Sequence, residues 1–238
     1  MSKKDAMVVV GGSGEMFDRI ASRYDRMNQI ISLGLDRGWR KALVAALAIP
    51  ENGRVLDVAT GTGDVAIAIA TTHSASTVSG LDPSEGMLEV GRKKVGKQGL
   101  SERVQLDFGD AQSMPYETDS FDAACISFGI RNVPDRLQGL REMVRVTKPG
   151  KKVCILELSE PKGGVMSAFA RLHVHHVVPL LGAILSGQWE YRYLQKSIAA
   201  FPPPDKFSLV MEEAGLEKVE AQRFLFGVAH LYTGTVSG

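Results

Sequence analysis

Short apolar runs rich in β-branched residues alternate along the chain with stretches whose apolar positions recur at helical spacing. Most of the runs are nearly continuous in apolar residues, which is typical of strands buried on both faces of a parallel sheet. The predicted strands are RVLDV (54–58), TVSGLD (77–82), RVQLDF (103–108), FDAACISF (121–128) and KVCILEL (152–158).

Three helical patterns lie between these strands, at 64–72, 84–95 and 135–147. Pro83 and Pro134 open two of the helices, and Lys148-Pro149-Gly150 stops the last one. Such a βαβ series predicts an α/β fold with a doubly wound, mostly parallel sheet of seven strands. Two further strands, 217–225 and 227–235, are separated by a turn at Phe226-Gly227 that has no room for a crossover helix. The last strand is therefore expected to be antiparallel.

Composition places the chain among ordinary globular proteins. It has 238 residues, 44% of them hydrophobic, and a net charge of +1, so one domain is expected and no nucleic-acid partner is indicated. Cys125 and Cys154 each sit inside an apolar run, which suits buried, reduced thiols in a cytosolic protein, and no metal-ligand cluster is apparent. Residues 1–15 are interpreted as a flexible tail and 16–238 as the single domain.

Open α/β sheets bind ligands beyond the carboxyl ends of their strands, and these ends are polar here. The first strand runs into ATGTGDVA, where Gly61 and Gly63 permit a tight turn, and Asp82 follows about 20 residues later at the place of a ribose-binding acid. This pattern alone fits a dinucleotide-binding site, and the glycines could also serve only helix packing.

The third strand adds Asp110 and Ala111 just past its end. A carboxylate beside an exposed backbone N–H can accept from an exocyclic amine and donate to a ring nitrogen, as an adenine edge requires. The alternative is that Asp110 merely caps a turn. The pair of Asp110 and Ala111, together with the glycine turn and Asp82, favours a crevice for an adenine nucleoside.

Four longer segments carry a family resemblance: FDRIASRYDRMNQIISLGLDRGWR (17–40), VLDVATGTGD (55–64), DAQSMPYETDSFDAACISFGIRNVPD (110–135) and EYRYLQKSIAAFP (190–202). Over residues 16–235 the chain resembles the ubiquinone and menaquinone biosynthesis C-methyltransferases, a family with the Rossmann-like fold of class I methyltransferases dependent on S-adenosylmethionine. SFGIRN and YRYLxxSI are the specific motifs. Thr60 stands where a glycine is often found, and PPPDKF is unusually rich in proline.

The resemblance implies methyl transfer from S-adenosylmethionine to a ring carbon of a reduced, prenylated benzoquinol or naphthoquinol. The residues it assigns to the cofactor are Tyr24, Asp57, Thr60, Gly61, Thr62, Gly63, Asp82, Pro83, Met87, Asp110, Ala111 and Ser127. Those it assigns to catalysis are Arg131, Asn132, His176 and Tyr193.

Arg131 and His176 each have a physical rationale and an alternative. A fixed cation at a strand end can stabilise the phenolate that makes a ring carbon nucleophilic, so Arg131 and Asn132 are expected to face the quinol oxygens. Arg131 could instead form a structural ion pair with a surface carboxylate. His176 is the candidate general base, although a histidine among apolar neighbours is often hydrogen-bonded in a core.

Two segments outside the βαβ series are expected to cover the crevice. Phe17, Ile20, Tyr24, Met27 and Ile31 recur at helical spacing, which predicts an amphipathic helix that caps the cofactor, unless packing alone explains it. An insertion around 160–200, most apolar at 166–187, is interpreted as a helical lid that makes transient contact with a membrane surface. A cytoplasmic protein on the inner face of the membrane is therefore expected, with a homodimer left open.

Three other functions share some of these features. A methyltransferase for another lipid or small molecule would have the same fold. An oxidoreductase dependent on NAD would share the glycine turn and Asp82, and a nucleotide-binding scaffold would bind the cofactor without transferring a methyl group.

Overall fold

The computed structural model describes residues 13–32, 34–160 and 188–238. Seven strands form one sheet, and each predicted strand is present within a few residues of its predicted bounds. They are β1 (Arg54–Val58), β2 (Thr77–Asp82), β3 (Val104–Phe108), β4 (Phe121–Ser127), β5 (Thr147–Leu158), β6 (Leu216–Phe224) and β7 (Ala229–Val236).

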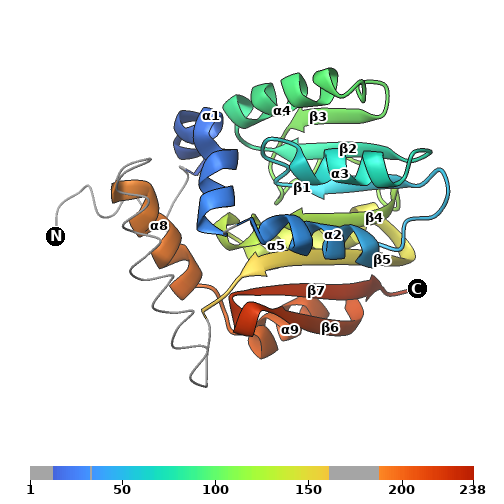
Figure 1. Ribbon diagram of the computed structural model, residues 1–238. Coiled ribbons are helices and arrows are strands. Elements are labelled where there is room, and N and C mark those ends of the chain that lie inside the picture. The colour runs from blue at the N-terminus through green and yellow to red at the C-terminus, as the bar shows by residue number, and fades with distance from the viewer. Residues whose placement is uncertain (1–12, 33, 161–187) are drawn as a thin grey trace.

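The strand order is β3-β2-β1-β4-β5-β7-β6. The first five strands pair in parallel, whereas β7 is antiparallel to both β5 and β6 (Figure 1). The prediction of a mostly parallel, doubly wound sheet with a reversed last strand is confirmed. The order reverses direction at β1, whose neighbours are β2 and β4, and such a switch point opens a crevice at the carboxyl edge.

The helices cover both faces of the sheet, because strands that are apolar on both sides need partners on both sides. The two layers are formed by α2 (Asp36–Ala46), α3 (Asp64–Thr72), α4 (Glu85–Lys97), α5 (Arg136–Val146) and α9 (Pro204–Glu213), whereas α1 (Ser13–Ile31) and α8 (Gln188–Ala199) lie outside them. One apolar cluster joins α2, α3 and α4 to the sheet, and a second joins α5 and α9 to its other face.

Two boundaries differ from the prediction. Helix α5 ends at Val146, and β5 already begins at Thr147, where the sequence suggested only a stop signal at 148–150. Thr147 pairs with Phe121 of β4 while its hydroxyl donates to the Met143 carbonyl, so both elements use this residue. Helix α1 begins at Ser13, inside the segment 1–15 that was expected to be a flexible tail.

Helices α1 and α8 lie outside the two layers, at the end of the sheet where the parallel strands terminate (Figure 1). Both belong to the segments that were expected to cover the crevice. The predicted lid, residues 166–187, lies outside the described residues. No helix in the described part of the chain is both long and apolar enough to cross a membrane.

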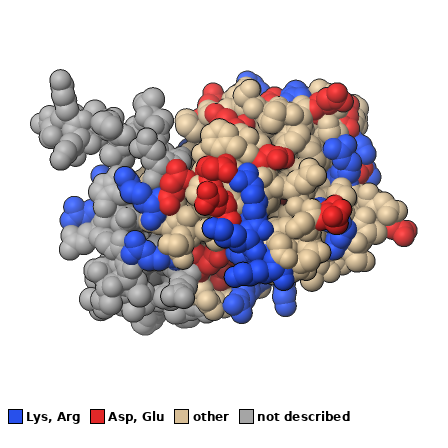
Figure 2. All heavy atoms as spheres, turned by 90° about the horizontal axis from the view of Figure 1, so that it is seen from above, with Lys and Arg blue, Asp and Glu red and all other residues tan. Residues whose placement is uncertain are grey.

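Charged side chains of both signs share the surface. The face seen from above in Figure 2 carries a band of Lys and Arg with Asp and Glu directly beside it. Ion pairs between neighbouring helices, such as Lys94 of α4 with Asp64 of α3, account for part of this mixing. The balance agrees with the net charge of +1.

Candidate functional site

A cavity of about 410 Å³ lies at the carboxyl edge of the sheet, over the switch point at β1. This volume is within the range of small-molecule sites in proteins. Many of the residues that the sequence assigned to the cofactor line it together, from segments far apart in the chain. They are Tyr24, Gly61, Asp82, Pro83, Met87, Asp110, Ala111 and Ser127, and the candidate catalytic residue Asn132 lines it as well.

The glycine loop between β1 and α3 forms one wall. Gly61 and Gly63 have φ angles of +56° and +77°, a left-handed conformation that only glycine adopts at little cost. The Asp57 carboxylate accepts from the Thr60 hydroxyl at 2.6 Å and from the Ala66 N–H at 3.1 Å. Asp57 therefore fixes both ends of the loop.

Asp57 itself does not line the cavity, and neither do Thr60, Thr62 or Gly63. Its side chain is buried, and burial raises its pKa to about 6 against the lowering effect of its hydrogen bonds. Of the loop residues named as candidates, the structure brings only Gly61 to the cavity. The others position the loop.

Asp82 ends β2 and projects into the cavity. One carboxylate oxygen accepts from the Gly61 N–H at 2.8 Å and the other from the Ser84 N–H at 2.9 Å. Burial raises the pKa of Asp82 to about 6, although these two backbone donors lower it. Each oxygen can still accept another hydrogen bond, so the carboxylate can receive a pair of vicinal hydroxyls.

Asp110 lies past the end of β3, on the cavity wall. Its Oδ1 accepts from the Gln112 N–H two residues later at 2.9 Å, and the Gln112 side-chain amide donates to both of its oxygens. The turn-capping alternative is therefore part of its role. Because Asp110 is exposed and Ala111 lines the same wall, the carboxylate and an adjacent backbone segment both border the cavity.

The chain segments that follow β1 and β4 approach each other closely at the floor of the cavity. Ala59 and Phe128 line the cavity with φ angles of +50° and +57°, a costly conformation for residues with a Cβ. A Cβ on Gly129 would stand 2.6 Å from the Ala59 Cβ, so only glycine fits there. The neighbouring Ser127 hydroxyl is buried and has no hydrogen-bond partner within the described residues.

Helix α1 covers the cavity and is fastened at two points. Asp18 accepts from the Ser84 hydroxyl at 2.6 Å and from the Gly86 N–H at 2.9 Å, at the start of α4. About two turns further, Asp25 accepts from the Thr62 hydroxyl at 2.6 Å and pairs with Lys94 at 2.9 Å.

This double fastening orients the face of α1 that carries the aromatic residues. Phe17 and Tyr24 both line the cavity, and their rings meet edge to face with centroids 5.9 Å apart. Helix α1 thus places two aromatic rings against the cavity, and its role as a cap over a bound cofactor stays a prediction. Asp18 and Thr62 both help to hold α1 in place. The sequence analysis did not single out Asp18.

Arg131 does not line the cavity. Its guanidinium pairs with Glu157 of β5, with Nη1 and Oε1 2.7 Å apart, and the two side chains are 6% and 0% exposed. Glu157 also accepts from the Arg131 N–H at 3.1 Å and from the Leu158 N–H at 2.8 Å. The structure therefore shows the ion-pair alternative for Arg131. Its partner is a carboxylate buried in the sheet rather than one on the surface.

The charge of Arg131 is consequently balanced within the protein. Burial pulls the pKa of Arg131 down, but the carboxylate of Glu157 outweighs it, and the pKa lies above its ordinary value. The expectation that the charge of Arg131 faces a ligand is therefore corrected. A strand-end arginine gives no sign in the sequence that the next strand supplies its counter-ion.

Asn132, in contrast, lines the cavity next to Arg131. Its Oδ1 accepts from the Tyr193 hydroxyl of α8 at 3.0 Å. Burial raises the pKa of Tyr193, against the lowering effect of Arg131 and Arg136, so the phenol is a hydrogen-bond donor at neutral pH. His176 lies outside the described residues, so this candidate base has no described position.

The residues around the cavity fit S-adenosylmethionine. Asp82 can accept two ribose hydroxyls, and Asp110 with Ala111 borders a site for an adenine edge. The unpartnered Ser127 hydroxyl supplies a further polar contact for the rest of the cofactor. Within the described ranges, no group of three or more His, Cys, Asp and Glu residues is placed to hold a metal ion.

The strand order and the reversed β7 are those of the class I methyltransferase fold, and the cavity lies at its switch point. A methyltransferase from Aquifex aeolicus described as SAM dependent has the same fold, with a TM-score of 0.58 and 18% identity over 83% of this chain and 89% of that one.

Sequence comparison identifies the family within this class of protein. The model of the ubiE/COQ5 methyltransferase family matches residues 3–236. A ubiquinone/menaquinone biosynthesis C-methyltransferase UbiE of Geotalea daltonii is 42% identical over 92% of this chain and 94% of its own length. A demethylmenaquinone methyltransferase of Deinococcus radiodurans is also 42% identical, over 92% of this chain and 90% of its own. The chain belongs to the ubiE/COQ5 methyltransferase family and is a C-methyltransferase of quinone biosynthesis.

Proposed function

We propose that this enzyme transfers the methyl group of S-adenosylmethionine to a ring carbon of a reduced, prenylated quinol. The benzoquinol and naphthoquinol forms are both within the proposal, as the names of the relatives cover both. The observation that carries it is the bond between Asn132 and Tyr193, which sets an amide and a phenol at the cavity wall where α8 arrives. Two such groups can hold the oxygen of a phenolic ring.

Methyl transfer is an in-line displacement at an electrophilic methyl group, which S-adenosylmethionine supplies when it is bound. The protein has to align the two reactants and keep water out. Asp82 and Asp110 hold the nucleoside part at the ends of β2 and β3. Phe17 and Tyr24, on the fastened helix α1, close the cavity with aromatic surface.

The ring carbon becomes nucleophilic when the neighbouring hydroxyl loses its proton. The Asn132 side-chain N–H can donate to the resulting oxygen, because the Tyr193 hydroxyl donates to Asn132 Oδ1 and so sets which way the amide faces. Arg131 acts through Asn132, because its pair with Glu157 fixes the backbone that carries the amide. His176 stays the proposed base for the phenolic proton.

Methylation of defined quinols tests the proposal. The purified enzyme is incubated with labelled S-adenosylmethionine and a short-chain demethylmenaquinol or demethylated benzoquinol, each kept reduced. We expect label in the quinol, and about 100-fold less in Asn132→Ala, the usual scale for loss of one group that stabilises an oxyanion. If the enzyme binds S-adenosylhomocysteine but labels neither quinol, the proposed substrate class is wrong.

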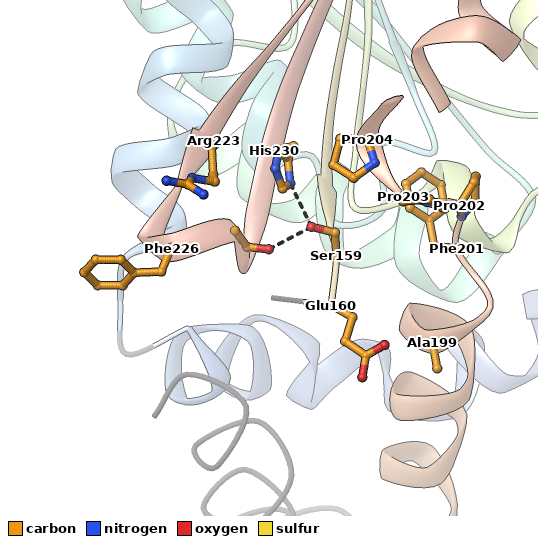
Figure 3. Close-up of a pocket in the computed structure, with 11 residues that line it drawn as sticks. Ser159, Glu160, Ala199, Phe201, Pro202, Pro203, Pro204, Arg223, Phe226 and His230 are labelled. Carbon is orange, nitrogen blue, oxygen red and sulfur yellow. Dashed lines mark hydrogen bonds between the residues drawn. The ribbon is translucent and has the colours of Figure 1, made fainter. Parts of the chain in front are cut away.

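We also propose a transient contact with the membrane surface, because a prenyl tail remains in the bilayer. The turn between β6 and β7 exposes Leu225 and Phe226 by 44% and 45%. In Figure 3 the Phe226 ring points away from Ser159 and His230. Large apolar side chains at the edge of the sheet near α8 are suited to shallow insertion between lipid headgroups.

Flotation with vesicles tests this contact. We expect Leu225→Asp and Phe226→Asp to lower the fraction of protein that floats with vesicles of bacterial lipid, since a charge opposes insertion. Leu209 of α9, 54% exposed, is the matched control, and Leu209→Asp should float like the unaltered enzyme. Equal flotation of all four proteins would remove this turn from the membrane contact.

A further inference from the structure

A second arginine lies beside the corner of the cavity where Asn132 meets Tyr193. Arg136 is the first residue of α5, and its side chain is half-buried. Its Nη2 donates to the Arg131 carbonyl oxygen at 3.2 Å, and its guanidinium lies over the ring of Phe201, 5.6 Å from the ring centroid. Both contacts hold the guanidinium in place, but neither of them neutralises its charge.

The carboxylates nearest to Arg136 are engaged elsewhere. Glu157 is paired with Arg131, and Asp135, which precedes α5, accepts from the Gln138 N–H at 3.0 Å. Among the residues that the structure describes, no carboxylate lies within ion-pair distance of Arg136, and its Nε is buried without a hydrogen-bond partner. The charges of Arg131, Glu157 and Arg136 therefore sum to +1, and the excess belongs to Arg136.

The position of Arg136 disfavours a positive charge. A cation at the first residue of a helix lies at the positive end of the helix dipole. Burial lowers the pKa of Arg136 more than Glu157 and Tyr193 raise it, so folding works against the charged form. An arginine nevertheless stays protonated at neutral pH. A charge kept at a cost to stability beside a binding cavity is typical of a functional group.

Arg136 lies close to the backbone of Asn132. The carbonyl that accepts from its Nη2 belongs to the peptide bond between Arg131 and Asn132. Adding the lengths of the C=O and C–N bonds to this hydrogen bond places Nη2 at most about 6 Å from the Asn132 backbone nitrogen. Asn132 lines the cavity and Arg136 does not, so the charge lies just outside the lining.

The Tyr193 hydroxyl shows that this charge reaches the corner. Tyr193 is itself a phenol bound to the Asn132 amide, at 3.0 Å. Burial raises its pKa most, Arg131 and Arg136 each lower it, and Glu157 raises it. Since Arg131 and Glu157 act in opposite directions, the effect of Arg136 is the part without an opposing charge. A substrate phenol at the same amide would lie in the same field.

We propose that Arg136 supplies the positive charge that stabilises the phenolate oxygen of the substrate at Asn132. The inference rests on the proposed function. In that reaction the hydroxyl proton leaves first, and the ring carbon then bonds to the methyl group while the methyl–sulfur bond breaks with its electron pair on sulfur. The ring proton is finally lost as the oxygen regains one. Asn132 touches the oxygen, whereas Arg136 acts on it through its field and is a positioning residue.

The size of the effect follows from which form of the substrate feels the charge. The field favours the charged oxygen and leaves the neutral quinol nearly unaffected. Loss of a group that donates directly to an oxyanion typically costs about 100-fold or more in turnover, and a charge outside the lining should give less. We expect kcat to fall about 10-fold in Arg136→Gln, with KM for the quinol nearly unchanged.

Three variants separate the charge from the other contacts of Arg136. Arg136→Gln removes the charge but retains an amide donor, whereas Arg136→Lys keeps the charge and should keep most of kcat. Arg141 of the same helix is 53% exposed and lies 3.8 Å from Glu213, so Arg141→Met is the matched control and should match the unaltered enzyme. If Arg136→Gln does not fold, Arg136→Met replaces it, since it keeps an apolar contact with Phe201.

The experiment measures kcat and KM against pH without oxygen. The probes are labelled S-adenosylmethionine and demethylmenaquinol with one isoprenyl unit, kept reduced with dithionite. The deficit of Arg136→Gln should shrink as pH rises toward the ordinary pKa of a phenol, about 10, because the hydroxyl then ionises without help. The other charged or titratable groups at this corner, Arg131, Glu157, Tyr193 and Tyr24 of α1, are the same in every variant.

An unchanged kcat in Arg136→Gln would overturn the role of Arg136. Equal losses in Arg136→Gln and Arg136→Lys, or a deficit that is the same at every pH, would also overturn it, because the contacts rather than the charge would then matter. If the unaltered enzyme methylates neither quinol, the proposed function itself is wrong.

Discussion

The buried pair of Arg131 and Glu157 predicts a large loss of stability for Glu157→Gln. The substitution removes one negative charge at nearly constant volume, while the side chains of both partners are at most 6% exposed. Glutamine keeps only one acceptor oxygen, so it can accept from one of the Arg131 and Leu158 N–H groups but not from both, and it cannot balance the guanidinium charge. Removing one partner of a buried ion pair typically costs about 3 to 5 kcal/mol, because the other charge remains buried and unpaired.

Urea unfolding, followed by the fluorescence of the buried Trp39, measures this loss. For a chain of this size 1 kcal/mol corresponds to a shift of about 2 to 4 °C in Tm, so Tm should fall by about 6 to 20 °C. Calorimetry with S-adenosylhomocysteine, below the new Tm, should show nearly unaltered affinity, since neither residue lines the cofactor cavity.

The double variant Arg131→Met with Glu157→Gln is the control. It removes the uncompensated charge, so it should be more stable than Glu157→Gln alone. If Glu157→Gln unfolds within about 0.5 kcal/mol of the unaltered enzyme, the pair does not hold this edge of the sheet. If Arg131→Lys loses about 100-fold in turnover with unchanged stability, the charge of Arg131 acts on the substrate and our assignment is wrong.

Two further predictions concern the cofactor cavity. Asp82→Ala should weaken S-adenosylmethionine binding by about 1.5 to 3 kcal/mol in calorimetry, the scale of hydrogen bonds to a charged group. The affinity for S-adenosylmethionine should also fall as the pH drops through about 6, because only the ionised Asp82 carboxylate accepts from both ribose hydroxyls and it becomes protonated in this range. Asp82→Asn, which does not titrate, should flatten this pH profile. Asp25→Asn should speed proteolysis within α1 and weaken S-adenosylhomocysteine binding about 3- to 10-fold, by loosening the bonds to Thr62 and Lys94. A variant with unaltered proteolysis and affinity would show that packing alone holds α1.

The fold could be predicted because its signals are local. Continuous apolar strands, helical spacing between them and the short turn at Phe226-Gly227 each constrain the neighbouring elements, and together they determine a doubly wound sheet with a reversed last strand. Asp82 and Asp110 could be located for a similar reason, as Asp82 is the last residue of β2 and Asp110 lies two residues past the end of β3, and both strand ends must lie at the cavity.

The partners of buried polar groups could not be predicted, since they join residues far apart in the sequence. Arg131 meets Glu157 only because β4 and β5 are adjacent, and His230 meets Ser159 only because β7 is reversed beside β5. The left-handed backbone of Phe128 likewise has no signal in its residue type. Such features follow from the assembled sheet.

The fastening of α1 by Asp18 and Asp25 has a kinetic consequence. Asp18 bonds to the start of α4, and Asp25 bonds to Thr62 of the glycine loop and to Lys94 of α4, so both anchors lie in segments whose neighbouring residues Gly61 and Met87 line the cavity. Occupancy of the cavity and closure of the helix must then favour each other by the same factor. We therefore expect S-adenosylhomocysteine to dissociate more slowly from the unaltered enzyme than from Asp25→Asn, in which α1 is held less firmly.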